Sequence, residues 1–307
     1  MKIAFLFSGQ GAQYPGMMKD LYETEKAAKA VFDAADRTLG RGVSTLCFEG
    51  TQEDLNLTHN TQPCVLAVDL AAGMILKDHG IRPDAAAGFS LGEYAALTFS
   101  GAMTQEEAFR IIQIRADAMQ EAVPQGKGAM AAFVGVTPEQ AEAICGQVDD
   151  YVVPANYNSL VQTVISGTTA GVDKACEIAE AQGIRCVKLA VSAPFHCKLM
   201  EPAAKKLEDV FAGMQFEDSE MPVYMNVNGL PLQGSARIAD LLVKQAMSPV
   251  RWVQTLQKMQ EDGIDTFIEC GPGRTLSGLV KKTLKDVNIY RVEDQKTLEN
   301  TLAALNA

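Results

Sequence analysis

The sequence lacks any run of apolar residues long enough to cross a membrane, because charged or polar residues interrupt every hydrophobic stretch. It also lacks an N-terminal leader pattern, since an apolar strand pattern begins at once after Met1-Lys2. We therefore expect a cytoplasmic protein with no membrane partner. The 307 residues, 47% of them hydrophobic and 21% charged, are enough for a globular protein with a large buried core.

Positive charge is scarce as well. The chain has 27 lysines and arginines against 38 aspartates and glutamates, a formal net charge of −11. This balance argues against nucleic acid as a partner, because a phosphate binder needs a basic surface. Metal-binding cysteine spacing is also absent, since the seven cysteines form no Cys-x-x-Cys pair. Their odd number and their apolar surroundings predict reduced, buried thiols, no disulfide framework and no metal site.

A tight turn between a short strand and a helix is the most informative feature that is present. A strand over residues 85–88 runs into Gly88-Phe89-Ser90-Leu91-Gly92, and an apolar helix ends near Gly101. Small residues flank the serine because such a turn has no room for larger side chains. The pattern predicts Ser90 as a nucleophile, with the N–H of Leu91 at a helix N-terminus where an oxyanion is stabilised. The alternative is a serine that only caps the helix.

Glycines follow the first strand, in Gly9-Gln10-Gly11, and we expect one helix from about Met17 to Leu39 after them. A nucleotide-binding loop is the weaker interpretation, because a third glycine and a Gly-Lys-Ser/Thr pattern are both missing. In serine hydrolases the loop after an early strand supplies an oxyanion donor, and the N–H of Gln10 would do so here.

Two helices flank the turn in sequence. Thr61 is the expected N-cap of an apolar helix over residues 64–77, which His79 ends. After the turn, Thr104 and Glu107 form a capping-box pattern that begins a helix to about Val123. Arg115 lies beside the apolar positions of that second helix, and the pattern leaves open whether it is solvated or functional.

The pattern changes at Pro124–Gly128, which predicts a domain boundary there. The elements that follow, to about Val191, read βαββαβ, the ferredoxin-like order, and the strand-helix alternation then resumes. We expect an α/β protein with a ferredoxin-like subdomain at 127–196 inserted into a discontinuous catalytic core at 1–126 and 197–307. Of the three histidines, His196 is the one at this junction, and it is either structural or a catalytic base.

Four stretches stand in order along the chain. They are Gly9-Gln10-Gly11-Ala12-Gln13, Gly88-Phe89-Ser90-Leu91-Gly92-Glu93-Tyr94, Ser192-Ala193-Pro194-Phe195-His196 and Glu269-Cys270-Gly271-Pro272-Gly273. With Arg115 and Asn156-Tyr157-Asn158 between them, the sequence resembles the malonyl-CoA:acyl carrier protein transacylases of bacterial fatty acid synthesis over essentially the whole chain. The resemblance implies an α/β-hydrolase-like core with the ferredoxin-like subdomain. It also implies ping-pong transfer of malonyl from coenzyme A to the phosphopantetheine thiol of acyl carrier protein, without a cofactor or a metal, by a monomer.

By this resemblance Ser90 is the nucleophile, His196 is its base, and the N–H groups of Gln10 and Leu91 form the oxyanion hole. Arg115 would bind the free malonyl carboxylate, because a guanidinium matches a carboxylate in two hydrogen bonds. Gln62 and Asn158 match polar positions that line the family's active site. A backbone carbonyl within Pro249-Val250-Arg251-Trp252 would orient His196.

Some positions depart from the commonest family pattern. Phe89 stands where many members have histidine, Leu160 where a proline often stands, and Arg251 where glutamine is frequent. None of these changes removes a chemical role. Phe195, beside the base, would crowd a branched acyl group and favours malonyl over methylmalonyl.

Three alternatives remain from the sequence. A serine thioesterase or esterase would use water in place of the acceptor thiol, and an acyltransferase of a polyketide synthase would differ only in its carrier protein. A non-enzymatic binding protein would require Ser90 and His196 to lie far apart.

Overall fold

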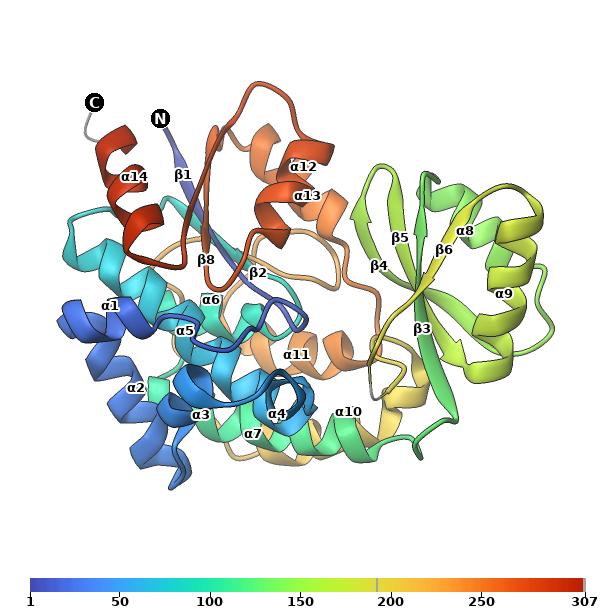
Figure 1. Ribbon diagram of the computed structural model, residues 1–307, viewed down its shortest axis with the longest axis horizontal. Coiled ribbons are helices and arrows are strands. Elements are labelled where there is room, and N and C mark those ends of the chain that lie inside the picture. Colours follow the sequence, from blue (N-terminus) through green and yellow to red (C-terminus); the bar gives the residue numbers. More distant parts are fainter. Residues whose placement is uncertain (192, 306–307) are drawn as a thin grey trace.

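The computed structural model describes residues 1–191 and 193–305, which form a larger and a smaller region with one β-sheet each (Figure 1). The strands are β1 (Ile3–Phe7), β2 (Ala85–Gly88), β3 (Gly128–Val134), β4 (Val152–Ser159), β5 (Gln162–Thr168), β6 (Arg185–Lys188), β7 (Val223–Tyr224), β8 (Thr266–Cys270) and β9 (Asn288–Val292). The α-helices are α1 (Lys19–Thr24), α2 (Lys26–Leu39), α3 (Val43–Glu49), α4 (Gln52–Asn56), α5 (Thr58–Asp78), α6 (Gly92–Phe99), α7 (Gln105–Glu121), α8 (Pro138–Cys145), α9 (Thr169–Ala181), α10 (Glu201–Phe211), α11 (Ile238–Ala246), α12 (Trp252–Glu261), α13 (Thr275–Thr283) and α14 (Gln295–Leu305). Within these residues, no helix has the length and apolar character that a membrane crossing needs.

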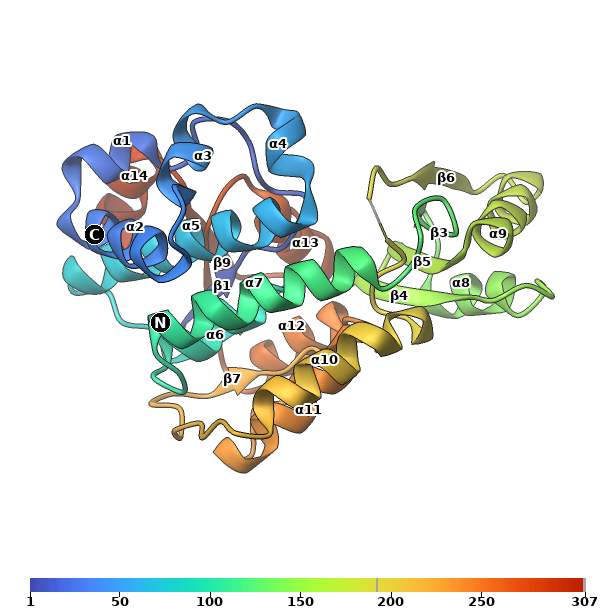
Figure 2. The ribbon, with the colours of Figure 1, turned by 90° about the horizontal axis from the view of Figure 1, so that it is seen from below.

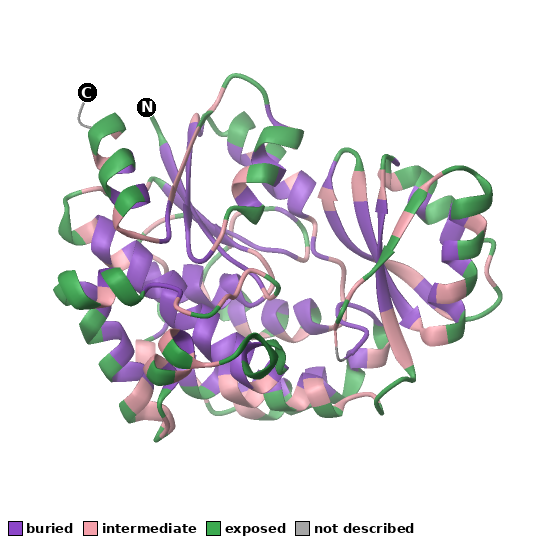
Figure 3. Cartoon of the chain, in the orientation of Figure 1, coloured by how far each residue is buried: buried purple, intermediate pink, exposed green. Residues whose placement is uncertain are grey.

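The larger sheet is parallel, with the strand order β7-β2-β1-β8-β9. All residues of β1, β2 and β8 are buried, because helices cover both faces of a parallel sheet. This burial explains the uninterrupted apolar pattern of β1 and β2. Figure 3 shows buried residues along these strands and exposed residues on the outer faces of the helices. The carboxyl ends of β1 and β2 lie side by side, since Phe7 pairs with Gly88. The loops that follow these two strands therefore start at the same edge of the sheet.

The smaller sheet is antiparallel, with the strand order β4-β5-β3-β6, and α8 and α9 pack against it. Its elements follow the order expected from the sequence. The long helix α7 runs from the larger region toward this sheet, beside α10 (Figure 2). The return segment after β6 leads back to the larger region, and Ser192 of the expected junction motif lies outside the described residues.

Two expectations for the N-terminal helices were wrong. A single helix over 17–39 is interrupted at Glu25, whose extended backbone separates α1 from α2. The helix α5 begins at Thr58, so Thr61 lies inside the helix and does not cap it. Pro63 is tolerated there because the carbonyl of His59, which it cannot engage, accepts hydrogen bonds from Arg41 and Gln113 side chains at 2.8 and 3.3 Å.

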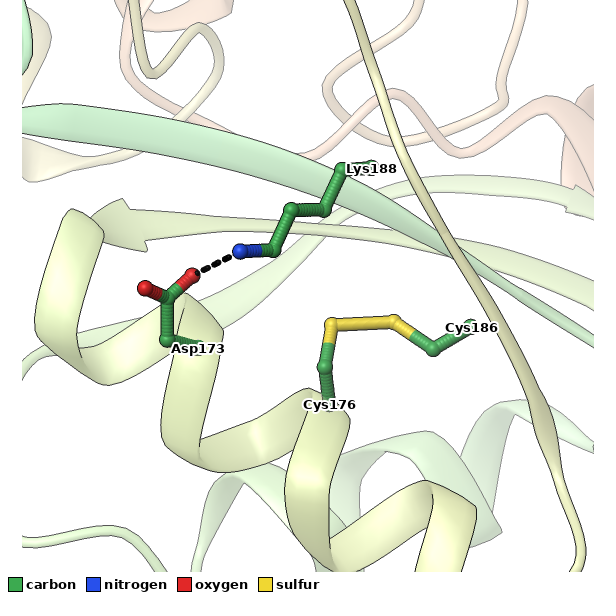
Figure 4. Close-up of a disulfide and its surroundings, with 4 residues drawn as sticks. All are labelled: Asp173, Cys176, Cys186 and Lys188. Carbon is green, nitrogen blue, oxygen red and sulfur yellow. Dashed lines mark ion pairs between the residues drawn. A yellow bond between two sulfur atoms is a disulfide. The ribbon is translucent and has the colours of Figure 1, made fainter.

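The expectation that all thiols are reduced was also wrong. Cys176 on α9 and Cys186 on β6 form a disulfide with a Cα–Cα distance of 5.6 Å (Figure 4). An ion pair between Lys188 Nζ and Asp173 Oδ1, at 2.7 Å, joins the same two elements. The sequence pattern missed the pair because only the fold, in which β6 turns back along α9, brings the two thiols together. The other five cysteines are free and buried.

Candidate active site

Ser90 lies at the tip of the turn between β2 and α6, as the glycine pattern predicts. A Cβ on Gly88 would collide with the carbonyl group of Gly92, and a Cβ on Gly92 would collide with the carbonyl oxygen of Phe7. Neither position can therefore hold any residue other than glycine. Ser90 itself has φ 55°, in the left-handed region that few side chains other than glycine adopt. Phe89, the departure from the family pattern, packs its ring edge-on to Trp252, with ring centroids 5.3 Å apart.

His196 forms a hydrogen bond with the serine. Its Nε2 lies 2.7 Å from Ser90 Oγ, and its Nδ1 lies 2.9 Å from the backbone carbonyl oxygen of Gln245. The histidine is therefore oriented by α11 and not by the segment 249–252, so that expectation was wrong. Gln245 lies in the last turn of α11, where its carbonyl also accepts from the N–H of Ser248 over 3.5 Å. A carbonyl oxygen has two lone pairs, so it can accept the proton of Nδ1 as well. Nε2 then accepts the hydroxyl proton of Ser90.

Burial keeps His196 neutral. The ring is only 4% exposed, and desolvation, together with the charge of Arg115, lowers the pKa of His196 to about 4. A neutral imidazole that already accepts a hydrogen bond from a hydroxyl group can act as a general base.

Arg115 is buried within the site and is not solvated, which removes one of the two possibilities that its sequence position allowed. Nη1 donates to Gln62 Oε1 over 2.7 Å, and Nη2 donates to Gln245 Oε1 over 2.9 Å and to Ser90 Oγ over 3.0 Å. Its guanidinium also lies over the ring of Tyr94, at 5.3 Å. Burial lowers the pKa of Arg115 below its usual value. All of its hydrogen-bond acceptors are neutral oxygens, so a carboxylate would find an uncompensated positive charge here.

A cavity of about 340 Å³ opens over Ser90. All seven residues expected at the site line it, namely Gln10, Gln62, Ser90, Leu91, Arg115, Asn158 and His196. The remaining lining is largely apolar and includes Phe195 next to the base. Asn158 donates from Nδ2 to Gln162 Oε1 over 3.3 Å, while its Oδ1 has no partner among the described residues.

The loop after β1 approaches the turn closely. A Cβ on Gly9 would lie 2.9 Å from the carbonyl oxygen of Phe89, so only glycine allows this approach without a shift. It brings the backbone of Gln10 beside the turn, while the side chain of Gln10 donates to Thr58 Oγ1 over 3.2 Å. The N–H groups of Gln10 and Leu91 have no acceptor among the described residues. Two backbone donors are thus available at the cavity wall.

Two amide side chains that the sequence interpretation missed complete the site. Asn226 accepts from the N–H of Ser90 and donates to the carbonyl of Gly88, both over 2.7 Å. Gln245 donates from Nε2 to the carbonyl of Ser90 over 2.7 Å. No local pattern marks either residue, because their partners in the turn, Gly88 and Ser90, lie more than 130 positions away in the chain. In the described part of the chain, no cluster of three or more His, Cys, Asp or Glu is arranged to hold a metal ion.

Comparison with known proteins gives consistent matches over nearly the full length. Residues 4–301 match the family described as "Acyl transferase domain". The "Malonyl CoA-acyl carrier protein transacylase" of Bacillus subtilis (strain 168) is 44% identical over 308 residues, covering 99% of this chain and 97% of that protein. The protein of the same name from Escherichia coli (strain K12) is 37% identical over 305 residues, covering 98% of this chain and 99% of that protein.

Solved structures give the same result. The malonyl CoA-acyl carrier protein transacylase of Clostridium perfringens superposes with a TM-score of 0.96 at 42% identity, covering 100% of this chain and 98% of that one. A malonyl-transacylase in complex with a type II PKS acyl-carrier protein superposes with a TM-score of 0.96 at 37% identity, covering 99% of this chain and 100% of that one.

Proposed function

Because this chain belongs to the family of malonyl CoA-acyl carrier protein transacylases, we propose that it moves a malonyl group from coenzyme A to the phosphopantetheine thiol of an acyl carrier protein in fatty acid synthesis. The protein is an acyltransferase. One observation carries the mechanism: Ser90 Oγ lies 2.7 Å from Nε2 of a buried, neutral His196 and 3.0 Å from Nη2 of Arg115. A nucleophile, its base and an anion-binding group therefore meet at one atom.

In the first half-reaction His196 Nε2 accepts the proton of Ser90 Oγ while Oγ attacks the thioester carbonyl carbon of malonyl-CoA. The carbonyl oxygen gains negative charge, and the N–H groups of Gln10 and Leu91 stabilise it, each by about 3 kcal/mol. The C–S bond then breaks. The departing thiolate of coenzyme A takes the proton from His196, which leaves malonyl esterified to Ser90.

The second half-reaction reverses the first with a new thiol. His196 accepts the proton of the phosphopantetheine thiol, the sulfur attacks the ester carbonyl, and the C–O bond to Ser90 breaks. Ser90 Oγ recovers its proton from His196. The apolar lining of the cavity supports transfer over hydrolysis, because it offers water few groups that would orient it for attack.

Arg115 sets the specificity in this proposal. Its guanidinium binds the free carboxylate of malonyl. The charged carboxylate oxygens replace neutral side-chain oxygens as acceptors, and they form stronger hydrogen bonds with the guanidinium. An acetyl group brings no carboxylate and leaves the buried charge without compensation, so it binds less well. Gln62 and Asn158 would bind polar atoms of the acyl chain or the pantetheine arm, and the ring of Phe195 would exclude a branched acyl group.

We also propose an α/β-hydrolase-like core at 1–126 and 197–307 with a ferredoxin-like subdomain at 127–196. The parallel sheet with the serine turn after β2 supports the first assignment. The strand order β4-β5-β3-β6 with two helices on one face supports the second. The cytoplasmic location, the monomeric state and the absence of a cofactor remain predictions from the sequence.

Mass spectrometry of the intact protein tests the proposed function. Brief incubation with malonyl-CoA should add one malonyl group to the native protein and none to Ser90→Ala. Holo acyl carrier protein, added next, should take the malonyl group from the native protein and become malonyl acyl carrier protein. Ser277→Ala, a change at a serine outside the site, is the control and should be malonylated like the native protein. Accumulation of free malonate without an adduct would point to a thioesterase. An adduct that persists in Ser90→Ala would refute the assignment of the nucleophile.

A further inference from the structure

The backbone of Ser90 is held in a conformation that a serine does not favour. Its φ of 55° places it in the left-handed region, which is uncommon for residues other than glycine. Such a conformation costs about 1–3 kcal/mol and persists only where the surrounding structure over-determines it. The structure must therefore contain groups that hold the main chain of Ser90.

Asn226 is the first of these groups. Strand β7 pairs in parallel with β2 as far as the pair Ala87 and Tyr224, and Asn226 follows two residues later, where β2 turns away. Its side-chain amide continues the hydrogen-bond ladder that the backbone has left. Oδ1 accepts from the N–H of Ser90 and Nδ2 donates to the carbonyl of Gly88, both over 2.7 Å.

Asn226 is itself fixed on both sides. It is fully buried, its N–H donates to Glu93 Oε2 over 2.6 Å, and its carbonyl accepts from the N–H of Arg251 over 2.9 Å. Its backbone therefore belongs to the framework of the larger region, and its amide has one available orientation. In the flipped orientation, NH₂ would face the N–H of Ser90 and two donors would meet.

Gln245 is the second group and acts on the opposite side of the same residue. Its Nε2 donates to the carbonyl of Ser90 over 2.7 Å, and its Oε1 accepts from Arg115 over 2.9 Å. Its backbone carbonyl accepts from His196 over 2.9 Å. One fully buried residue of α11 thus contacts the nucleophile's backbone, the base and the cationic group.

We propose that Asn226 and Gln245 are positioning residues of the transfer reaction, whose side-chain amides bind the N–H and the C=O of Ser90 and hold its Oγ between His196 and Arg115. This inference rests on the proposed function. Holding Ser90 also fixes the N–H of Leu91, the next residue, so the same two amides place an oxyanion donor. Loss of either amide lets the backbone relax, and a displacement of about 1 Å at a reacting atom lowers a rate by about 100-fold.

The test measures the reactivity of Ser90 with a probe that does not need Arg115. A dialkyl fluorophosphate forms a bond between phosphorus and Ser90 Oγ and releases fluoride, while the hydroxyl proton passes to His196. The variants are Asn226→Ala and Gln245→Met, the second of which keeps the side-chain length without the amide. Asn60→Ala is the matched control, since Asn60 is a buried amide whose Oδ1 accepts from Arg41 and whose Nδ2 donates to the carbonyl of Asp54.

We expect each variant to be labelled at least 10-fold more slowly than the native protein, at a temperature well below its own Tm. The control should lose a similar amount of thermal stability and keep the native labelling rate. Single-turnover acylation by malonyl-CoA should slow by the same factor, with the concentration of malonyl-CoA at half-maximal rate changed by less than threefold. Labelling of both variants within twofold of the native rate would overturn the proposal.

A second pair of outcomes separates this inference from the proposed function. If the native protein is labelled but never malonylated, the transfer function fails while the labelling comparison still decides the positioning role. If Asn226→Ala does not fold, Asn226→Asp takes its place, because it keeps the acceptor for the N–H of Ser90 but loses the donor to the carbonyl of Gly88. It should also be labelled at least 10-fold more slowly than the native protein, and labelling within twofold of the native rate would overturn the role of Asn226.

Discussion

Arg115 Nη2 donates a hydrogen bond to Ser90 Oγ over 3.0 Å, so the cation that we assign to the malonyl carboxylate also contacts the nucleophile. The guanidinium is only 1% exposed and is hydrogen-bonded to neutral oxygens alone. In the proposed function, a substrate carboxylate would replace some of these contacts with stronger, charge-assisted ones. Recognition of the acyl group and release of Ser90 Oγ for attack would then be linked through one side chain.

Arg115→Ala should change the choice of acyl group. We expect kcat/KM for malonyl-CoA to fall by about 100-fold or more, because hydrogen bonds between charged groups contribute about 1.5–3 kcal/mol each. The rate with acetyl-CoA should fall less, since acetyl makes no such bond. Intact-protein mass spectrometry after incubation with either thioester measures both rates, and Arg37→Ala, at an exposed arginine, is the control. An equal fall with both thioesters would contradict the role in specificity.

The low pKa of His196 should make acylation insensitive to mild acid. Because desolvation lowers this pKa to about 4, the base remains neutral from pH 7 to pH 5. The single-turnover rate should change by less than about twofold over that range. A histidine with the ordinary pKa of about 6.5 would slow the reaction by roughly 25-fold at pH 5. His196→Ala should reduce the rate by about 100-fold or more at every pH, and a rate that follows a pKa near 6.5 would show that the base is solvated.

Glu93 should make the folded protein less stable as pH rises. Burial raises the pKa of Glu93 from 4.5 to about 8, so between these values the folded state binds more protons than the unfolded state. The neutral carboxyl group makes its full contribution to the free energy of unfolding below pH 4.5. This contribution decreases as the pH rises and is lost as the pH passes through about 8. Glu93→Gln has no such titration. The difference in free energy of unfolding, variant minus native, should therefore increase by a few kcal/mol from pH 5 to pH 8 in urea unfolding. Glu106→Gln, at an exposed glutamate, should show no such trend, and a constant difference for Glu93→Gln would contradict the prediction.

The features that the sequence predicted are those encoded by neighbouring residues. The strand at 85–88 and the turn at Ser90 follow from glycines whose missing side chains leave room for the backbone of Phe7 and Gly92. The capping box of Thr104 and Glu107 is present as predicted, because its two partners are three residues apart. The residue types that allow such elements stand close together in the sequence, so a single sequence is enough to predict them.

The features that were missed depend on contacts between distant segments. Thr61 resembles a cap, but side chains from Arg41 and Gln113 satisfy the carbonyl that Pro63 leaves free, so the helix extends past it. The carbonyl that orients His196 comes from Gln245 and not from segment 249–252, because the fold places the last turn of α11 against the histidine. Such partners depend on how distant segments pack together, which cannot be predicted from the local pattern of a single sequence.

The disulfide between Cys176 and Cys186 should stabilise the smaller region without affecting transfer. Closing a loop of ten residues stabilises a protein by about 3 kcal/mol, because it restricts the unfolded chain. Neither cysteine lines the cavity at Ser90, so Cys176→Ala should keep the native rate of malonyl transfer. Denaturation without reductant should leave five of the seven thiols reactive.

Reductant separates the bond from the packing of its sulfur atoms. A reducing agent should lower the free energy of unfolding of the native protein and of Cys145→Ala, whose thiol is free and buried in the same region. It should leave Cys176→Ala unchanged, since that variant has no bond to break. If seven thiols react without reductant, the two cysteines are neighbours without a bond, and the stabilisation of the smaller region comes from the apolar contacts between α9 and its sheet.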